Sequence, residues 1–447
     1  EVKASRCQLM KQPTVTLIYF LQESNTMSSV DPRVAAARSI SAVSAGKSLE
    51  RALGAYRDHP ERGLIFELCY GVVRHWFSLS EQLDLRLKTP LRKKHLDLYC
   101  LIMVGNYQLQ NSAIADHAAV NLTVEAARHL GKHWACGLVN AILRTPRESV
   151  DQSDEARFEA PSWLIQSIQR HYPDSAEKIL RVNNTRAPMT LRVNRNRQTT
   201  ESLAQILLNE GIPTVPGSLT NALSLVTPQA VNTIPGYSEG WFTVQDEASQ
   251  RAIHLLELQP TTRVLDACAA PGIKALQLLE TCDDIQLTAI DIDPTRGSYG
   301  TNESLRLGLP FELRVGDATR RDWWDGELFD SILIDAPCTG TGTLRRKPDI
   351  KVHRTLEDVV VLQRKQQDLL TNLWHMLASG GTLLYSTCSI LPDENDSVIH
   401  NFLDQTADAA AVPIDADWGH ATLFGRQCLP TERGPDGFFY SRITKLQ

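Results

Sequence analysis

From about residue 262 onward, short apolar runs alternate with amphipathic helical segments, and this alternation limits the fold more than any other feature of the chain. The runs that we predict as strands are residues 263–267, 286–291, 311–315, 330–335 and 381–385. Buried strands that alternate with helices form a parallel, doubly wound sheet. Two weaker strands, 427–429 and 438–444, are predicted to close the chain as a hairpin. The C-terminal part is therefore predicted to have an α/β fold.

The part of the chain from about residue 31 to 148 has helical periodicity and almost no strand-like alternation. Asp31 can cap the first helix, with Pro32 at the first helical position. The further helices that we predict are residues 61–79, 94–109, 116–129 and about 134–143. This part is predicted to be a compact all-α domain.

Between these two parts the pattern is mixed. Residues 145–158 are polar and are predicted to be a linker or loop. Residues 160–258 mix helix and strand, with a strand at 189–194 and a helix at 201–210 that ends at Gly211. We therefore expect an all-α domain over 31–148, a small α/β connecting domain over 160–258 and an α/β domain over 259–447.

Residues 1–30 are expected to be an N-terminal extension that is either unstructured or an artefact, because Met27 looks like the true start. The nine cysteines are odd in number, and no pair has C-x-x-C spacing, so we expect neither a disulfide framework nor a zinc site. The longest apolar runs are too short to span a bilayer. We therefore expect a cytoplasmic protein without a metal, and nothing in the sequence indicates more than a monomer.

The formal net charge of −6 argues, as an average, against a nucleic-acid binder. The charge is unevenly distributed, because residues 31–150 hold 16 Lys and Arg against 11 Asp and Glu. Residues 345–354 (RRKPDIKVHR) form a basic run that can hold the phosphates of a substrate strand, and residues 91–95 are a smaller candidate. The alternative is that both runs are solvated surface.

Three predicted strands end in groups that suit an adenosyl cofactor. The segment DACAAPGIK (266–274) follows the first strand and opens a helix, but it is neither a dinucleotide-binding glycine loop nor a P-loop. Asp291 ends the second strand, where a carboxylate can accept hydrogen bonds from a ribose diol. Asp317 follows the third and can accept from an adenine amino group. The alternatives are a tight turn for the glycine segment and helix capping for Asp291.

Two cysteines follow later strands at the same predicted edge of the sheet. Cys338 lies in DAPCTGTG and Cys388 in STCS. A lone cysteine is more often an inert core residue. A thiolate next to positive charge or backbone N–H groups is, however, a strong nucleophile for an electron-poor carbon. Two cysteines at the edge that carries the cofactor segments therefore favour covalent chemistry.

Taken together, DACAAPGIK, AIDIDPTR, GDA, DAPCTGTG, RRKPDIK and STCSILPDEN resemble the RNA cytosine-C5 methyltransferases that use S-adenosylmethionine. Residues 101–109, 117–120 and 137–144 resemble the NusB-like helical domain of the RsmB-type (Fmu/Sun) ribosomal RNA small subunit methyltransferases. Residues 188–194 and 241–246 are similar to that family as well, so that the resemblance covers about 31–446. It implies an RNA-binding NusB-like domain followed by a Rossmann-like methyltransferase sheet.

The resemblance implies that the chain methylates C5 of a specific cytosine in 16S rRNA, free or in a small-subunit assembly intermediate. Cys388 would attack C6 of the base and Cys338 would assist release. Asp335 would contact the N3/N4 edge of the cytosine, and Lys274 would lie close to both ligands. The rival readings are the same chemistry on tRNA or another RNA, and a non-catalytic RNA-binding protein.

The residues that the resemblance assigns to S-adenosylmethionine are Cys268, Ala269, Ala270, Pro271, Gly272, Ile273, Lys274, Asp291, Asp317 and Asp335. One of them departs from the family pattern. Ile273 replaces a glycine, and a β-branched residue disfavours both a positive φ and a close backbone approach. We expect this change to affect the cofactor loop without removing a catalytic group.

Overall fold

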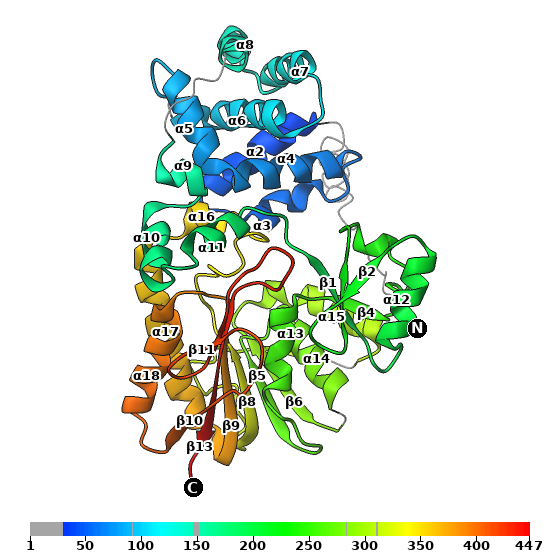
Figure 1. The fold of residues 1–447 in the computed structure, drawn as a ribbon, viewed down its shortest axis with the longest axis vertical. Helices are drawn as coiled ribbons and strands as arrows, with labels where there is room; N and C mark the ends of the chain where they lie inside the picture. Colours follow the sequence, from blue (N-terminus) through cyan, green and yellow to red (C-terminus); the bar gives the residue numbers. More distant parts are fainter. Residues whose placement is uncertain (1–29, 92, 146–151, 283, 310–311) are drawn as a thin grey trace, which may run out of the picture. The chain divides into compact units, whose positions relative to one another are not determined.

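The computed structural model describes residues 30–91, 93–145, 152–282, 284–309 and 312–447 (Figure 1). The chain forms two compact units, divided between Glu159 and Ala160. The extension predicted for residues 1–30 lies, except for its last residue, outside the described part. No helix within the described ranges is long and apolar enough to cross a membrane.

The first unit is helical, as predicted. Its helices are α2 (Pro32–Ser44), α3 (Leu49–Leu53), α4 (Arg62–Arg74), α5 (Trp76–Arg86), α6 (Leu96–Asn111), α7 (Asp116–His129), α8 (Cys136–Arg144) and α9 (Asp154–Phe158). Asp31 Oδ1 accepts a hydrogen bond of 2.8 Å from Arg33 N, which confirms the predicted cap. The helix predicted over 61–79 is instead two helices, α4 and α5, separated at His75.

The core of this unit is built around α6, which contacts α2, α4, α5, α7 and α8 (Figure 1). Because α6 has neighbours on all sides, its buried residues are not confined to one stripe. The segment predicted as a linker is only partly described, and its described part contains α9. Ser153 caps this helix by accepting a hydrogen bond from Ala156 N at 3.2 Å.

The second unit contains two sheets and their helices. Its helices are α10 (Ser162–His171), α11 (Ala176–Val182), α12 (Thr200–Asn209), α13 (Glu247–His254), α14 (Ile273–Thr281), α15 (Ser298–Leu307), α16 (Ile350–His353), α17 (Leu356–Trp374) and α18 (Asp396–Asp404). Its strands are β1 (Met189–Val193), β2 (Thr214–Pro216), β3 (Ala222–Leu225), β4 (Phe242–Val244), β5 (Arg263–Ala267), β6 (Gln286–Asp291), β7 (Leu313–Val315), β8 (Phe329–Asp335), β9 (Leu377–Thr387), β10 (Ala409–Val412), β11 (His420–Ala421), β12 (Arg426–Cys428) and β13 (Phe438–Lys445).

The larger sheet has the order β11-β12-β13-β9-β8-β5-β6-β7, with β10 paired to β13. The five strands β7, β6, β5, β8 and β9 are parallel, and β5 and β6 have the predicted bounds. The predicted parallel strands are therefore confirmed, and the C-terminal strand β13 extends the sheet antiparallel to β9. The predicted C-terminal hairpin is confirmed as the antiparallel pair β12–β13.

Helices cover both faces of this sheet (Figure 1). Leu265 and Ala267 of β5 pack in a core that includes α17 and α18, whereas Val264 packs in a core with α13 and α14. The chain runs from β5 to β6 and β7 on one side and then returns to β8 and β9 on the other. The strand order thus reverses between β5 and β8, and ligands of doubly wound sheets bind at such a point, outside the carboxyl ends of the strands.

The smaller sheet has the order β2-β3-β1-β4 and is antiparallel throughout. Arg192 of β1, which is fully buried, attaches it to the larger sheet. Its guanidinium forms two bonds of 2.8 and 2.9 Å to Glu280 of α14, and Nη1 donates to Ile273 O at 3.1 Å. A bidentate pair of this kind fixes orientation as well as distance. Arg192 therefore fixes α14, and with it the loop before α14, relative to the smaller sheet.

We predict that Arg192→Leu lowers the free energy of unfolding by about 3–5 kcal/mol, because it leaves the buried Glu280 carboxylate unpaired. Arg192→Leu combined with Glu280→Leu should recover most of this loss. The control is Arg181→Leu, which breaks an exposed pair with Glu177 and should cost less than about 1 kcal/mol. Denaturant unfolding measures the free energy of unfolding of all three variants. Equal losses of this free energy in Arg192→Leu and Arg181→Leu would contradict the account.

Candidate active site

The carboxyl ends of β8 and β9 bring two thiols together. These strands are parallel neighbours, and Asp335 lies opposite Ser386 in the register. Cys338 follows β8 and Cys388 follows β9, so that their sulfur atoms lie 3.4 Å apart. Both thiols are free and partly accessible. The structure thus brings together the two cysteines that the sequence singled out.

The surroundings of the two sulfur atoms shift their pKa values in opposite directions. The pKa of Cys388 is lowered, first by its hydrogen bond with Cys338; burial and the charge of Asp335 oppose this, and the charges of Lys347 and Lys274 add to it. The pKa of Cys338 is raised well above its ordinary value by that same hydrogen bond, by burial and by the charge of Glu394. Cys388 is therefore the better nucleophile, and Cys338 retains its proton.

A buried ion pair lies beside the thiols. Lys274 Nζ is 2.7 Å from Asp335 Oδ2, and Ser386 Oγ donates to Asp335 Oδ1 at 3.2 Å. Burial works to lower the pKa of Lys274, but the charge and hydrogen bond of Asp335 raise it above its ordinary value. The ammonium group also lies 5.4 Å from the ring centre of Phe438. Lys274 thus stays cationic and orients the carboxylate of Asp335.

The loop between β5 and α14 has an unusual backbone. Cys268 has a φ of 64° and Gly272 a φ of 97°, and Gly272 N donates to Ala269 O at 2.7 Å. Positive φ at a residue other than glycine is costly and clusters at ligand sites. Burial, followed by the charges of Asp291 and Asp335, raises the pKa of Cys268 to about 12, so this thiol stays protonated.

The structure explains why isoleucine is tolerated at position 273. Ile273 is the first residue of α14, and only Gly272 before it needs a positive φ. A β-branched residue fits a helical backbone at small cost. The carbonyl group of Ile273 accepts the hydrogen bond from Arg192, and backbone contacts of this kind do not depend on the side chain. The substitution therefore leaves the turn itself intact.

Two carboxylates stand at the ends of β6 and β7. Asp291 is almost fully buried and accepts hydrogen bonds from Ala270 N at 3.0 Å and Asp293 N at 2.9 Å. The helix-capping role considered for Asp291 belongs to Asp293, which accepts from Thr295 N at 2.9 Å. Asp317 accepts from Thr319, and although burial works against it, these hydrogen bonds lower the pKa of Asp317. Asp291 is thus tied by a hydrogen bond to the loop between β5 and α14.

Two further acids were not found from the sequence. Glu394 is fully buried and accepts from Thr339 N at 2.8 Å, so it orders the loop that carries Cys338; burial raises its pKa. Asp266 is fully buried too, and within the described residues neither of its carboxylate oxygens has a hydrogen-bond partner. Burial and the charge of Asp335 raise the pKa of Asp266 well above its ordinary value. Sequence reasoning had no signal for Asp266 beyond its place in DACAAPGIK.

The basic run 345–354 does not act as a phosphate-binding loop through its first two arginines, and this part of the prediction is wrong. Arg345 is fully buried, and its Nε lies 2.6 Å from Asp436 Oδ1. Arg346 pairs with the same aspartate and lies 2.7 Å from Asp246 Oδ2. These guanidinium groups tie together distant segments of the chain. Lys347 is exposed and is the member of the run whose charge acts on Cys388.

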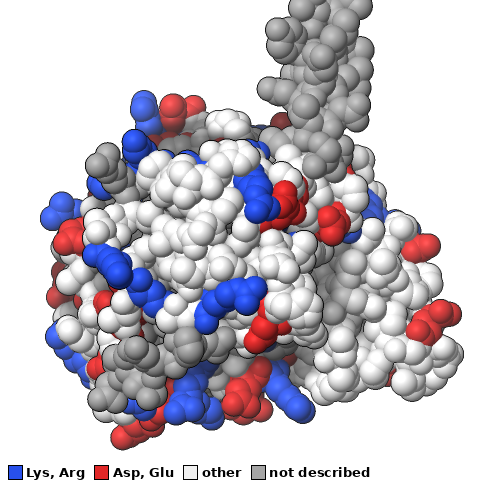
Figure 2. Space-filling model, turned by 90° about the horizontal axis from the view of Figure 1, so that it is seen from above, with Lys and Arg blue, Asp and Glu red and all other residues white. Residues whose placement is uncertain are grey.

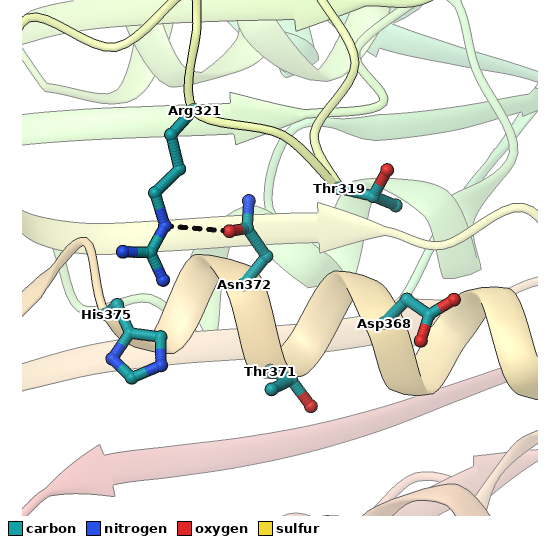
Figure 3. Close-up of a pocket in the computed structure, with 6 residues that line it drawn as sticks. All are labelled: Thr319, Arg321, Asp368, Thr371, Asn372 and His375. Carbon is teal, nitrogen blue, oxygen red and sulfur yellow. Dashed lines mark hydrogen bonds between the residues drawn. The ribbon is translucent and has the colours of Figure 1, made fainter.

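A polar hollow of about 370 Å³ lies away from the thiols, next to the loop of Asp317 (Figure 3). It is lined by Thr319, Arg321, Asp368, Thr371, Asn372 and His375. Arg321 and Asn372 point toward each other and are joined by a hydrogen bond of 2.9 Å, and Asn372 also donates to Ala318 O. These hydrogen bonds hold the Asp317 loop against α17 beside the hollow. No group of metal-ligating side chains occurs among the residues described.

Comparison with known proteins assigns the chain to a family. The family model described as 16S rRNA methyltransferase RsmB/F matches residues 253–444, the NusB family model matches 30–146, and the RsmF/B-like ferredoxin-like domain matches 160–232. Ribosomal RNA small subunit methyltransferase B of Pseudomonas syringae pv. tomato is 39% identical over 93% of this chain and 97% of its own length. The protein of the same name from Vibrio cholerae is 40% identical over 92% and 97%.

The chain belongs to the ribosomal RNA small subunit methyltransferase B family.

A solved structure supports the methyltransferase fold. A methyltransferase homolog protein from Pyrococcus horikoshii matches with a TM-score of 0.58 and 27% identity, and the match covers 65% of this chain and 97% of that one. The predicted fold class is confirmed, with a NusB-like helical part, a small ferredoxin-like sheet and a Rossmann-like methyltransferase sheet. For this member of the family, the structure adds a thiol pair, an ion pair and the loop between β5 and α14 at one edge of the larger sheet.

We predict that Lys347→Ala raises the pH at which Cys388 reacts with iodoacetamide, because loss of a nearby positive charge disfavours the thiolate. At a fixed pH below that midpoint, the variant should react more slowly than the unaltered protein. Mass spectrometry of alkylated peptides separates Cys388 from the other cysteines. Lys178→Ala, a change of an exposed lysine on α11, is the control and should cause no shift. Unchanged or faster alkylation in Lys347→Ala would refute the electrostatic account.

Proposed function

We propose that this chain transfers a methyl group from S-adenosylmethionine to C5 of a cytosine in 16S rRNA, through a covalent bond between Cys388 Sγ and C6 of the base. The observation that carries this proposal is the pair of thiols 3.4 Å apart, with the pKa of Cys388 lowered and that of Cys338 raised. The substrate class follows from the family, whose members are named for ribosomal RNA of the small subunit.

The residues at the sheet edge fit an adenosyl cofactor that carries positive charge. Asp291 and Asp317 end adjacent strands and offer carboxylate oxygens for a ribose diol and an adenine amino group. Asp266 is a buried carboxyl group without a hydrogen-bond partner in the described structure, and a cationic ligand nearby would favour its charged form. Gly272 permits the close turn. When bound there, S-adenosylmethionine supplies an electrophilic methyl group to C5.

The first step is attack on C6. The C5 position of cytosine is a poor nucleophile while the ring is aromatic. The Cys388 thiolate donates its electron pair to C6, the S–C6 bond forms, and electron density moves to C5 and to the N3 edge of the ring. Asp335 accepts a hydrogen bond from the N4 amino group, and the Lys274 cation, 2.7 Å from Asp335, offsets the negative charge that attack adds to the ring.

The last step is release of the enzyme. After C5 has taken the methyl group, its proton passes to water and the electrons of the C5–H bond restore the C5–C6 double bond. The S–C6 bond breaks, and its electron pair returns to Cys388 Sγ. Cys338 still carries its proton and lies within hydrogen-bond distance of the leaving sulfur, so it stabilises the thiolate as it forms. Glu394 holds the Cys338 loop in place through Thr339 N.

We predict that Cys338→Ala accumulates a covalent complex with RNA, because attack is intact while the leaving thiolate has lost its hydrogen-bond donor. Cys388→Ala should form neither the complex nor the methylated product. Denaturing gel electrophoresis measures the complex, and nucleoside mass spectrometry of 16S rRNA that lacks the modification measures 5-methylcytidine. Methylation by Cys388→Ala would overturn the assignment of the two thiols. Methylation of tRNA with 16S rRNA left unmodified would overturn the substrate.

We also predict that Asp291→Asn weakens binding of S-adenosylmethionine by about ten-fold or more, because a hydrogen bond to a charged group contributes roughly 1.5–3 kcal/mol. Asp293→Asn is the matched control on the same loop, and it should change affinity less than about two-fold because Asp293 caps the turn that follows. Isothermal calorimetry measures both. Equal affinities would contradict the ribose contact, and no binding by the unaltered protein at millimolar cofactor would contradict the enzyme.

A further inference from the structure

The helical unit carries a second candidate RNA site, which we call the Trp134 patch and define as Lys93, Lys94, His95, Lys132 and Trp134. The side chain of Trp134 is 59% exposed, whereas every other tryptophan of the chain is at least partly buried. Exposing an indole ring to water is unfavourable, so a tryptophan that is more than half exposed indicates a binding surface. The patch belongs to the basic part of the chain.

Two short turns fix the aromatic groups of the patch. His95 ends the turn Lys93–His95, which leads into α6, and Trp134 lies in the turn His133–Ala135, which leads into α8. Their ring centres are 5.1 Å apart. Ala135, next to Trp134, is fully buried and anchors its turn. The indole is therefore held in place by its neighbours. Because it is already ordered, binding a ligand costs little further side-chain entropy.

Positive charge surrounds the two rings. Lys132 Nζ lies 3.5 Å from His95 Nδ1 and 3.2 Å from Asp97 Oδ2, so one acid offsets one of the three lysines. Lys93 and Lys94 are exposed next to His95. In the view from above, Lys and Arg side chains, together with some Asp and Glu, border a wide uncharged area (Figure 2). Exposed cations next to an exposed indole match the charge of a phosphate backbone.

We propose that the Trp134 patch binds a single-stranded segment of the substrate RNA. An unpaired base stacks on the indole of Trp134, and the flanking phosphates lie against Lys93, Lys94 and Lys132. Stacking on an aromatic side chain combined with a cationic track is the way in which proteins bind single strands without reading their sequence. The inference rests on the proposed function in one respect only, namely that the substrate is RNA.

The test uses the full chain and a fluorescein-labelled, unstructured 12-nucleotide RNA, with binding followed by fluorescence anisotropy. Trp134→Ala should weaken binding by about ten-fold or more, and Trp134→Phe, which keeps an aromatic plane, should stay within about three-fold of the unaltered protein. Lys93→Ala with Lys94→Ala should reduce the slope of log K against log salt by about 1.4. Lys47→Ala, on the exposed turn after α2, is the charge control and should change neither quantity.

Three results would overturn the proposal. In the first, Trp134→Ala binds the single strand as well as the unaltered protein does. In the second, Trp134→Ala weakens binding of a blunt RNA duplex equally, which excludes stacking of an unpaired base. In the third, Trp134→Ala binds free RNA as the unaltered protein does, but its rate of methylation decreases on ribosomal particles that contain protein and on no other substrate. This result would assign the patch to a protein partner. Thermal unfolding of Trp134→Ala should match that of the unaltered protein, because the side chain is exposed.

The test of the Trp134 patch and the test of the proposed methylation can fail independently of each other. Cys388→Ala keeps the Trp134 patch and should bind the 12-nucleotide RNA normally while forming no product. If the patch proposal fails, Trp134→Ala still methylates cytosine in protein-free 16S rRNA. If the methylation proposal fails, the unaltered protein forms no 5-methylcytidine, whatever Trp134→Ala does to RNA binding.

Discussion

The parallel pairing of β8 with β9 is the interaction on which the candidate active site depends. It places Asp335 opposite Ser386, and the loops that follow then bring Cys338 and Cys388 within 3.4 Å of each other. Because β5 is the next strand in the sheet, its loop reaches the same edge and delivers Lys274 to Asp335. The positions of the two thiols, the Lys274–Asp335 ion pair and the loop before α14 thus follow from strand order and register.

Buried arginine–carboxylate pairs hold the loops of this edge in place. Arg192 joins the smaller sheet to α14, and Arg345 and Arg346 join the loop after Cys338 to Asp436 near the C-terminus. Such pairs add little net stability compared with well-packed apolar residues, but they are directional and costly to break singly. In this protein they restrict the positions of loops that would otherwise be free to move. Much of the positive charge around the site is therefore structural, and Lys347 is left to act on Cys388.

Local patterns predicted the framework well. Alternation of apolar runs and helices predicted β5 and β6 with their observed bounds, and the position of residues after strands placed Cys338 and Cys388 at one edge. These features depend on neighbours in sequence. The partners of Arg345 and Arg346 could not be predicted, because Asp436 is about ninety residues away and the charge run looked like solvated surface.

Strand periodicity predicted the C-terminal hairpin, but it does not say which strand of the sheet the hairpin joins, so the pairing of β13 with β9 could not be predicted. For Ile273, propensity alone predicted a strained turn, whereas the observed turn needs a positive φ only at Gly272.

The central claim is that Cys388, and not its neighbour, forms the bond to the base. The most direct measurement is peptide mapping of the complex trapped with RNA that contains 5-fluorocytidine, because fluorine at C5 cannot leave as a proton does and the S–C6 bond persists. The account predicts a single modified peptide, which carries the RNA-derived mass on Cys388. Mass on Cys338, or no covalent complex in the presence of S-adenosylmethionine, would contradict it.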